Sequence, residues 1–452
     1  MKKKIFSLIL TISCLNINAA DLFVYPGASS PDFSSIATAV DSANDGDRVL
    51  VSNGSYFGDI NIIAKSISIL PVISSNSITI QGNIIVNTDS SVSPKNITIS
   101  SVYIIGDFKH EGLNYLILTP YEINIINCTV IGEFNLNADN IITNIYYSTF
   151  YKSVYLNASL EIVGNTFEST SSGIDTISVL NGLWSNGSTL QSSEVKVFAN
   201  RFNNFQLRCD LTSGNIFSNI HIANNYFTSN LTGSGKSMLF LNGSTTSCLI
   251  ENNTFYDQQM NGSYSNGGDI LNSPNGLALL TIRNNIFLFH NNWSNNYYLF
   301  TFYPNGRNTV LKMEHNFVNQ TTYSVDGVLT SSYYGAYFYY TPYSTIVNNN
   351  IYDNSFNIQS SPPTLVINDT SGVPSAGVLT LTENAGKNII ECRDIDDTQN
   401  DVGTWGGPHS WTNYHQNSVG TARVIDIDIN SSINSITNGS LNIKAKSVNT
   451  NQ

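Results

Sequence analysis

The sequence predicts an all-β chain that winds as a parallel β-solenoid, and a short recurring phrase is the first observation behind this prediction. Each copy of the phrase runs from an apolar and a polar residue through asparagine and one variable residue to Phe or Tyr. The asparagines of six copies are Asn165, Asn200, Asn225, Asn253, Asn285 and Asn350. Looser copies end at Phe150 and Phe317, with Ser148 and His315 in the asparagine position. Successive aromatic residues lie 17 to 35 residues apart, a spacing typical of solenoid repeats.

The second observation is the strand pattern between the copies. Segments such as 60–62, 67–69, 78–80 and 97–99 alternate β-branched apolar residues with polar ones, which favours short strands with one buried face. The third observation is composition, because charged residues make up 12% of the chain and hydrophobic residues 41%. The polar surface must then come from Asn, Ser and Thr, as in β-rich extracellular proteins. A length of 452 residues would ordinarily suggest two or three domains, but an elongated solenoid can be one unit.

The recurring asparagines are expected to form scaffold. Asparagine tolerates the left-handed backbone conformation of a tight corner, and its amide carries both donors and an acceptor. Stacked coil on coil, these amides would form a hydrogen-bonded ladder while the aromatic residues stack inside.

The first twenty residues have the pattern of an export signal. Lys2, Lys3 and Lys4 precede an apolar run over 5–15 that is too short to span a bilayer. Cleavage after Ala19 or Ala20 would yield a secreted or cell-surface protein. The alternative is lipoprotein anchoring through Cys14. No later stretch has the length and apolarity of a membrane span.

The charge balance limits the partners. The formal net charge is −12 and the isoelectric point is about 4.8, which argues against nucleic acid, since its phosphates require a basic surface. An acidic polysaccharide would be repelled unless Ca²⁺ bridged the two.

The cysteines give no zinc signature. Those that follow the signal are scattered without CxxC spacing: Cys128, Cys209, Cys248 and Cys392. We expect buried thiols, with one disulfide between neighbouring coils as the alternative, since an export compartment permits it.

The N-terminal stretch carries a family resemblance. Residues 33–43 have apolar residues at helical spacing with Ser34 as the expected N-cap. A turn at Gly46-Asp47, a strand over 48–51 and a turn at 54–56 follow. This order resembles the N-terminal region of pectin-lyase-like right-handed parallel β-helix proteins of the secreted bacterial type. The resemblance implies a right-handed parallel β-helix whose open end is covered by a capping helix. The cap and first coil would occupy 21–59 and the β-helix 60–392.

A dense aromatic run is the strongest candidate for ligand binding. Aromatic platforms stack on sugar rings, and tyrosine adds a hydroxyl group for polar contacts. The candidate glycan-binding residues are Tyr333, Tyr334, Tyr337, Tyr339 and Tyr340. The alternative is that alternate members of the run pack inside the coils.

An acidic loop follows the β-helix. Residues 393–408 resemble the segment that closes many secreted bacterial β-helix proteins, and we expect a closing loop and strand over 393–430, then a tail over 431–452. Asp394, Asp396 and Asn400 lie at alternate positions, as oxygen ligands of Ca²⁺ do. Trp405 stands where an EF-hand has glutamate, so an EF-hand is excluded. A hydrogen-bonded turn without metal stays the alternative.

No recognisable lyase, polygalacturonase or pectin methylesterase motif is present, and whether the chain is an enzyme stays open. Stacking of coils in register would bring some mid-chain basic residues together with Glu251 or Glu314: Lys236, Arg283, Arg307 and Lys312. The histidines are expected to be packed or solvated. The sequence thus supports a secreted or surface protein that binds polysaccharide or cell-surface glycans. The alternatives are a lyase or hydrolase of acidic polysaccharide, and a structural surface stalk.

Overall fold

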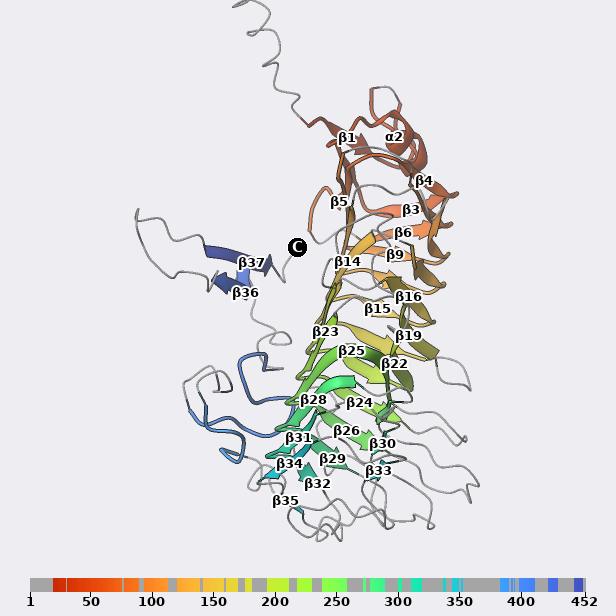
Figure 1. Cartoon of the computed structure of the whole chain (residues 1–452). Coiled ribbons are helices and arrows are strands. Elements are labelled where there is room, and N and C mark those ends of the chain that lie inside the picture. The colour runs from red at the N-terminus through yellow and green to blue at the C-terminus, as the bar shows by residue number, and fades with distance from the viewer. Residues whose placement is uncertain are drawn as a thin grey trace, which may run out of the picture.

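In the computed structural model the chain is a long rod of stacked coils (Figure 1). The structure describes residues 19–29, 31–74, 77–88, 93–112, 120–138, 141–157, 160–169, 175–180, 193–210, 218–229, 238–257, 271–273, 277–288, 300–302, 310–318, 336–338, 344–348, 351–352, 383–389, 392, 394, 398–410, 422–429 and 443–449.

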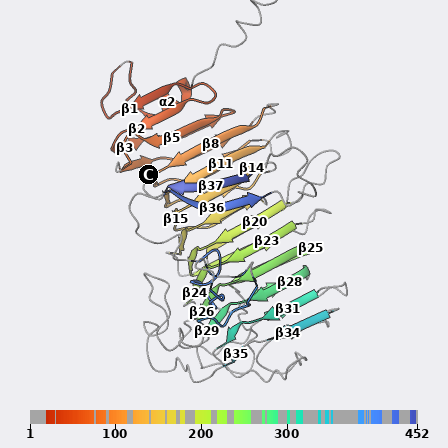
Figure 2. The same cartoon turned by 90° about the vertical axis from the view of Figure 1, so that its left-hand side faces the viewer.

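Every strand of the rod pairs in parallel with the strand one coil away, and three faces result. Face A comprises β1 (Asp21–Val24), β2 (Arg48–Val51), β5 (Ile67–Pro71), β8 (Lys95–Ser100), β11 (Tyr121–Ile126), β14 (Ile141–Tyr146), β17 (Leu160–Val163), β20 (Ser193–Phe198), β23 (Ser218–Ala223), the end of β25 (Leu239–Glu251), β28 (Leu277–Arg283), β31 (Val310–Glu314) and β34 (Ser344–Asn348). Figure 2 views this face directly.

The other two faces complete each coil. Face B comprises β3 (Gly54–Phe57), β6 (Ile78–Gln81), β9 (Val102–Ile104), β12 (Thr129–Val130), β15 (Thr149–Phe150), β18 (Thr166–Glu168), β21 (Arg201–Asn203), β24 (Tyr226–Ser229), β26 (Thr254–Asp257), β29 (Ile286–Leu288), β32 (Phe317–Val318) and β35 (Ile351–Tyr352). Face C comprises β4 (Ile60–Ile63), β7 (Ile84–Asn87), β10 (Phe108–Glu111), β13 (Phe134–Leu136), β16 (Val154–Asn157), β19 (Asp175–Leu180), β22 (Phe205–Asp210), the start of β25, β27 (Leu271–Ser273), β30 (Phe300–Phe302) and β33 (Ala336–Phe338).

This pairing confirms the predicted fold class, an all-β parallel β-helix. The hand of the winding stays a prediction, for which the right-handed preference of parallel crossovers is the physical reason.

The core is a set of columns that run along the rod. Alternate residues of each strand point inward, as Ile97 and Ile99 do with no exposed surface. The aromatic residues of the recurring phrase stack on face B, from Phe150 through Phe167, Phe202, Phe227 and Phe255 to Phe287, with successive ring centroids 4.4 to 5.2 Å apart. A single coil cannot form a core alone, so each coil buries its apolar residues against the neighbouring coils.

A helix lies at the N-terminal end of the rod (Figure 1). It is α2 (Ile36–Ser42), and its Ile36, Ala39 and Val40 are buried in the same core cluster as the first strands. Lys65 donates from Nζ to the carbonyls of Val40 and Ala43 at 2.8 Å each, which satisfies groups that a helix end leaves open. The N-cap is Ser35, without a side-chain cap bond. The expected cap at Ser34 was therefore wrong by one residue.

Beyond the rod, β36 (Ala422–Ile429) and β37 (Ile443–Asn449) form an antiparallel pair, which stands apart from the coils in Figure 1. The strand β37 lies where we expected a loose tail. Its register sets Lys446 opposite Asp426 and Lys444 opposite Asp428. Within the described part of the chain, no helix has the length and apolarity needed to cross a membrane.

Candidate functional site

The asparagines of the recurring phrase form one continuous chain of hydrogen bonds. In each coil, the backbone N–H and the side-chain amide of one asparagine donate to Oδ1 of the next, at 2.9 to 3.0 Å. The amide also donates to a strand carbonyl, as Asn225 does to Val197. The members are Asn165, Asn200, Asn225, Asn253, Asn285 and Asn316, all without exposed surface. Asn350 lies outside the described residues.

In the coil that contains β32, the ladder residue lies one position before the aromatic residue instead of two. Asn316, and not His315, accepts the bond from Asn285, and Phe317 pairs with Ile286 instead of Phe287. Our assignment of His315 to the asparagine position was therefore wrong. At the other end Ser148 does occupy that position, because its N–H donates to Asn165 and its hydroxyl accepts from Cys128 N.

The corner residue is the one that precedes each ladder residue. Ala199, Asn224, Asn252, Asn284 and His315 have φ angles between 53° and 56°, the left-handed region in which asparagine is enriched. We expected the ladder asparagine itself to adopt this conformation. In the copies with two consecutive asparagines, the first adopts the left-handed conformation of the corner, and the second forms the hydrogen bonds of the ladder.

The corner asparagines bind a segment from near the C-terminus, which we call the strap (described residues within 383–410). Asn224 Nδ2 donates to the Thr404 and Gly406 carbonyls at 2.9 and 2.5 Å. Asn252 Nδ2 donates to Asn400 Oδ1 and the Asp401 carbonyl, both at 2.8 Å. The acidic loop therefore lies against the outside of the middle coils.

An apolar cluster on the outer surface seats the strap. Val402 is fully buried with Ala223, Tyr226, Tyr256 and Ile286. At the strap's end, the His409 ring stacks on Phe198 with centroids 4.3 Å apart. These contacts bring strap side chains next to the charged residues of face A.

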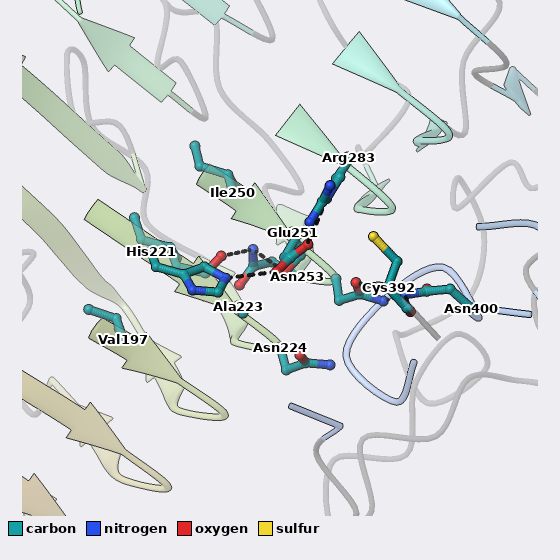
Figure 3. Close-up of polar contacts among 12 residues, drawn as sticks. Val197, His221, Ala223, Asn224, Ile250, Glu251, Asn253, Arg283, Cys392 and Asn400 are labelled. Carbon is teal, nitrogen blue, oxygen red and sulfur yellow. Dashed lines mark hydrogen bonds and ion pairs between the residues drawn. The ribbon is translucent and has the colours of Figure 1, made fainter. Parts of the chain in front are cut away.

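The charged residues meet at the ends of β23, β25 and β28 (Figure 3). Glu251 accepts from His221 Nε2 at 2.7 Å through Oε1, and from Arg283 Nε and Nη2 at 2.7 Å through Oε2. The side chain of Glu251 is 5% exposed, that of Arg283 14% and that of His221 27%. We call these three residues the Glu251 cluster.

Charge settles the protonation of this carboxylate. Burial alone raises the pKa of Glu251, but the hydrogen bonds and charges of His221 and Arg283 outweigh it and lower the pKa to about 2. Burial lowers the pKa of Arg283, but the charge and hydrogen bond of Glu251, acting together with neighbouring groups that include Glu314, outweigh burial and raise the pKa. Glu251 is thus an anion at neutral pH, which cannot donate a proton but can fix the orientation of the His221 ring.

Further ion pairs continue along the same face. Glu314 lies next to Arg283 in the strand register and pairs with Lys387 of the strap at 2.5 Å. Toward the N-terminus, Glu161 accepts from the Tyr146 hydroxyl at 2.6 Å and lies 3.7 Å from Lys196 Nζ. The outer side of face A therefore carries a row of paired charges that neighbouring coils and the strap supply.

A different row lies on the outer side of face C. Register places Tyr155, Ser178, Arg208 and Phe240 in successive coils at one strand position. The Arg208 guanidinium lies over the Phe240 ring, 4.1 Å from its centroid, a cation–π arrangement. Three coils further on, Tyr337 occupies the same register position. We call these residues the face C row.

No protein-family model and no curated protein matches the chain. Among solved structures, the crystal structure of pectate lyase Pel9A is 15% identical, with 86% of this chain and 97% of that chain covered and a TM-score of 0.34. The assignment of the fold rests on the strand pairing described above.

The predicted glycan-binding tyrosines are largely outside the described residues. Tyr337 lies in β33, while Tyr333, Tyr334, Tyr339 and Tyr340 are not among the described residues. The sequence does not reveal that Tyr337 shares a register position with Tyr155, Arg208 and Phe240, because these residues are far from it in the chain.

The predicted calcium ligands have other partners where the structure describes them. The Asp394 carboxylate accepts from the backbone N–H groups of Asp401 and Gly407. The Asn400 side chain bonds to Asn252 and to the Cys392 carbonyl, and Asp396 lies outside the described residues. Within the described residues, no three His, Cys, Asp or Glu side chains are grouped as a metal site would need. The calcium site stays a prediction.

The basic residues and cysteines can also be placed. Arg283 meets Glu251, whereas Glu314 pairs with Lys387, and Lys236 and Arg307 lie outside the described residues. Cys128, Cys209, Cys248 and Cys392 are all buried and none of them forms a disulfide, so the disulfide alternative was wrong for these residues.

Sequence reasoning missed the role of His221, which we expected to be packed or solvated. A signal was present: counted from the ladder asparagines, Glu251, Arg283 and Glu314 all lie two residues before, and Glu161, Lys196, His221 and Lys312 all lie four before. Both positions face outward, since the residue between them is buried. Alignment of the repeats on the ladder would have placed these charges together.

Proposed function

We propose that the chain is an exported β-helix protein that binds polysaccharide along the face C row and does not act on it. The observation that carries the proposal is the Arg208–Phe240 stack in one row with Tyr155. Aromatic faces and guanidinium planes present flat surfaces to sugar rings, and the tyrosine hydroxyl adds a polar contact.

The spacing of the row suits a long ligand. Neighbouring coils are about 4.8 Å apart, so Tyr155 and Phe240, three coils apart in register, are separated by roughly 14 Å. The backbone register places Tyr337 three coils further, roughly 29 Å from Tyr155. A polymer that runs parallel to the rod axis would contact several of these residues at once, and such multiple contacts raise affinity.

The test is binding to a panel of polysaccharides that includes pectin, polygalacturonate, alginate and neutral glucans, measured as retardation in affinity electrophoresis. We expect at least one polymer to retard the protein and Tyr155→Ala and Arg208→Ala each to weaken that binding about tenfold, a loss of ~1.4 kcal/mol. The matched control is Tyr103→Ala, since Tyr103 is 42% exposed on face B. Binding that is unchanged in both face C variants, or equally weakened by Tyr103→Ala, would contradict the proposal.

One observation favours a polysaccharide lyase or hydrolase as a second candidate. Arg283 lies beside two carboxylates, Glu251 and Glu314, and Glu251 orients a partly exposed histidine. An oriented imidazole is a suitable proton acceptor in catalysis. Assays for unsaturated or reducing ends on the same panel, with His221→Ala as the variant, separate the two candidates: product that disappears with His221→Ala favours the enzyme.

A further inference from the structure

We propose that export ends with hydrolysis of the Ala19–Ala20 bond, and that the new N-terminus of Ala20 forms an ion pair with the buried carboxylate of Asp47. Two cleavage positions agree with the sequence pattern, after Ala19 or after Ala20. The contacts around Asp47 distinguish them.

Asp47 is a carboxylate held at the start of the rod. Asp47 is buried, with 4% of its surface exposed. Oδ2 accepts from the backbone N–H of Asn44 at 2.7 Å, which closes the turn that precedes β2. Oδ1 accepts from the backbone nitrogen of Ala20, also at 2.7 Å. The turn accounts for the hydrogen bond to Oδ2. Oδ1 accepts from the Ala20 nitrogen, which is the atom that cleavage after Ala19 would release.

Ala20 is part of the folded structure rather than of the leader. Its carbonyl accepts from Arg48 N at 2.9 Å, and the parallel pairing of β1 with β2 begins at the next residue, with Asp21 opposite Arg48. Cleavage after Ala20 would remove two contacts, the bond from Arg48 N to the Ala20 carbonyl and the bond from the Ala20 nitrogen to Oδ1 of Asp47. Cleavage after Ala19 keeps both.

The chemistry is ordinary peptide hydrolysis by a leader peptidase of the export machinery. Water adds across the bond, the carbonyl carbon of Ala19 becomes a carboxylate, and the Ala20 nitrogen leaves as an ammonium group. The bond at 2.7 Å from an uncharged amide N–H to the carboxylate thereby becomes an ion pair, in which the attraction between two opposite charges is added to the hydrogen bond. The processed chain is therefore more tightly closed at its first strand than the precursor.

The charges around this position favour the ammonium form. Asp47 faces it directly, and Asp21 is paired with Arg48 through Nε and Nη2 at 2.7 and 2.8 Å. Asp45 of the same turn pairs with Lys95 at 2.9 Å. A free α-amino group has a pKa of roughly 7.7–8.0, and a carboxylate in contact raises it. The added stability is thus complete below about pH 8 and is lost as pH rises through the folded-state pKa.

The first test is the mass of the chain exported from its full-length precursor. We expect the mass of residues 20–452. A mass that begins at Asp21 or Ala19, or a lipid-modified Cys14, would overturn the proposal.

The second test is protection of the α-amine in that exported protein. We expect acylation of the Ala20 amine at pH 7 to be at least tenfold slower in the folded protein than after denaturation. Asp47→Asn should abolish the protection, while Asp41→Asn, which removes a charge from the exposed end of α2, should retain it. Equal reactivity in the folded and denatured wild-type protein overturns the proposal even if Asp47→Asn does not fold.

A chain that begins at Ala19 gives an independent reading. It keeps the Ala20 amide but moves the ammonium away from Asp47, so its melting temperature should lie a few degrees below that of the Ala20 chain at pH 7. The difference should shrink as pH rises toward 10. A difference that is absent at pH 7, or independent of pH, contradicts the ion pair.

Discussion

Asn225 donates twice to the same atom of Asn253: its backbone N–H and its side-chain amide both reach Oδ1 at 2.9 Å. The two bonds hold one coil directly above the next at a corner where strand pairing is interrupted. Because Asn253 is itself bonded in the same way to Asn285, the loss of one member affects the coils on both sides.

Asn253→Ala should therefore be strongly destabilising. It leaves the backbone N–H of Asn225 without its acceptor and removes the side-chain amide that donates to the carbonyls of Ile222 and Glu251. Each buried unpaired group costs about 1–3 kcal/mol, so we expect the free energy of unfolding to fall by about 3 kcal/mol or more. Thermal unfolding followed by circular dichroism measures it. Asn96→Ala, at an exposed position of β8, is the control and should change little.

The pKa of Glu251 predicts a specific acid sensitivity. Its folded-state value of about 2 lies below the ordinary value of 4.5, so ionised Glu251 stabilises the fold above about pH 4.5, and this contribution is lost as pH falls toward 2. A shift of this size corresponds to about 3 kcal/mol.

Glu251→Gln should then lower stability at pH 7 and leave Arg283 buried without its anion. The gap between wild type and variant, measured by denaturant unfolding at fixed temperature, should stay constant from pH 7 to 5 and narrow between pH 4.5 and 2. Glu194→Gln is the matched control, since that side chain is 62% exposed. A gap that does not change over this range would contradict the assigned pKa.

The strap should open locally when its corner contacts are removed. Asn252→Ala deletes the amide that donates to Asn400 and to the Asp401 carbonyl, while Asn253 and the ladder stay intact. We expect faster proteolytic cleavage within 383–410 at an almost unchanged melting temperature, because the strap lies outside the coils and local opening need not unfold the rod. Mass analysis of the first cut decides: cuts within the coils in place of the strap would show that the two do not open separately.

The periodic features of the fold could be predicted from the sequence because each coil needs the same residue types at its corner and in its core. The ladder and the stacked aromatic residues recur at visible spacing, and the apolar residues of 33–43 show the spacing of a helix. A further column was missed although it is also periodic: Asp59 accepts from Asn83 N, and Asn83 from Asp107 N. The glycine before each keeps the column tight, since a Cβ at Gly82 would lie 2.3 Å from the Gly58 carbonyl oxygen.

The strap and the Glu251 cluster could not be predicted in the same way. Asn252 and Asn400 are 148 residues apart, and nothing local to either residue indicates the other. The pairing of His221 with Glu251 depends on the register between coils of unequal length, which the repeated phrase defines only after alignment on the ladder. Local pattern therefore predicts the coils, whereas contacts across the outer surface require the three-dimensional arrangement.

In a protein prepared to begin at Ala20, the thiols should be unreactive until the rod unfolds. Burial raises the pKa of Cys128 to about 11 and that of Cys248 well above its ordinary value, and the reactive form of cysteine is the thiolate. Cys128, Cys209, Cys248 and Cys392 are all buried, and none of them forms a disulfide. We expect no reaction with an aromatic disulfide reagent at pH 8 in the folded protein and four equivalents after addition of guanidinium chloride. Two equivalents in the denatured protein would reveal a disulfide and contradict the arrangement of the core. Rapid reaction before denaturation would show that the coils around Cys128 and Cys248 open readily.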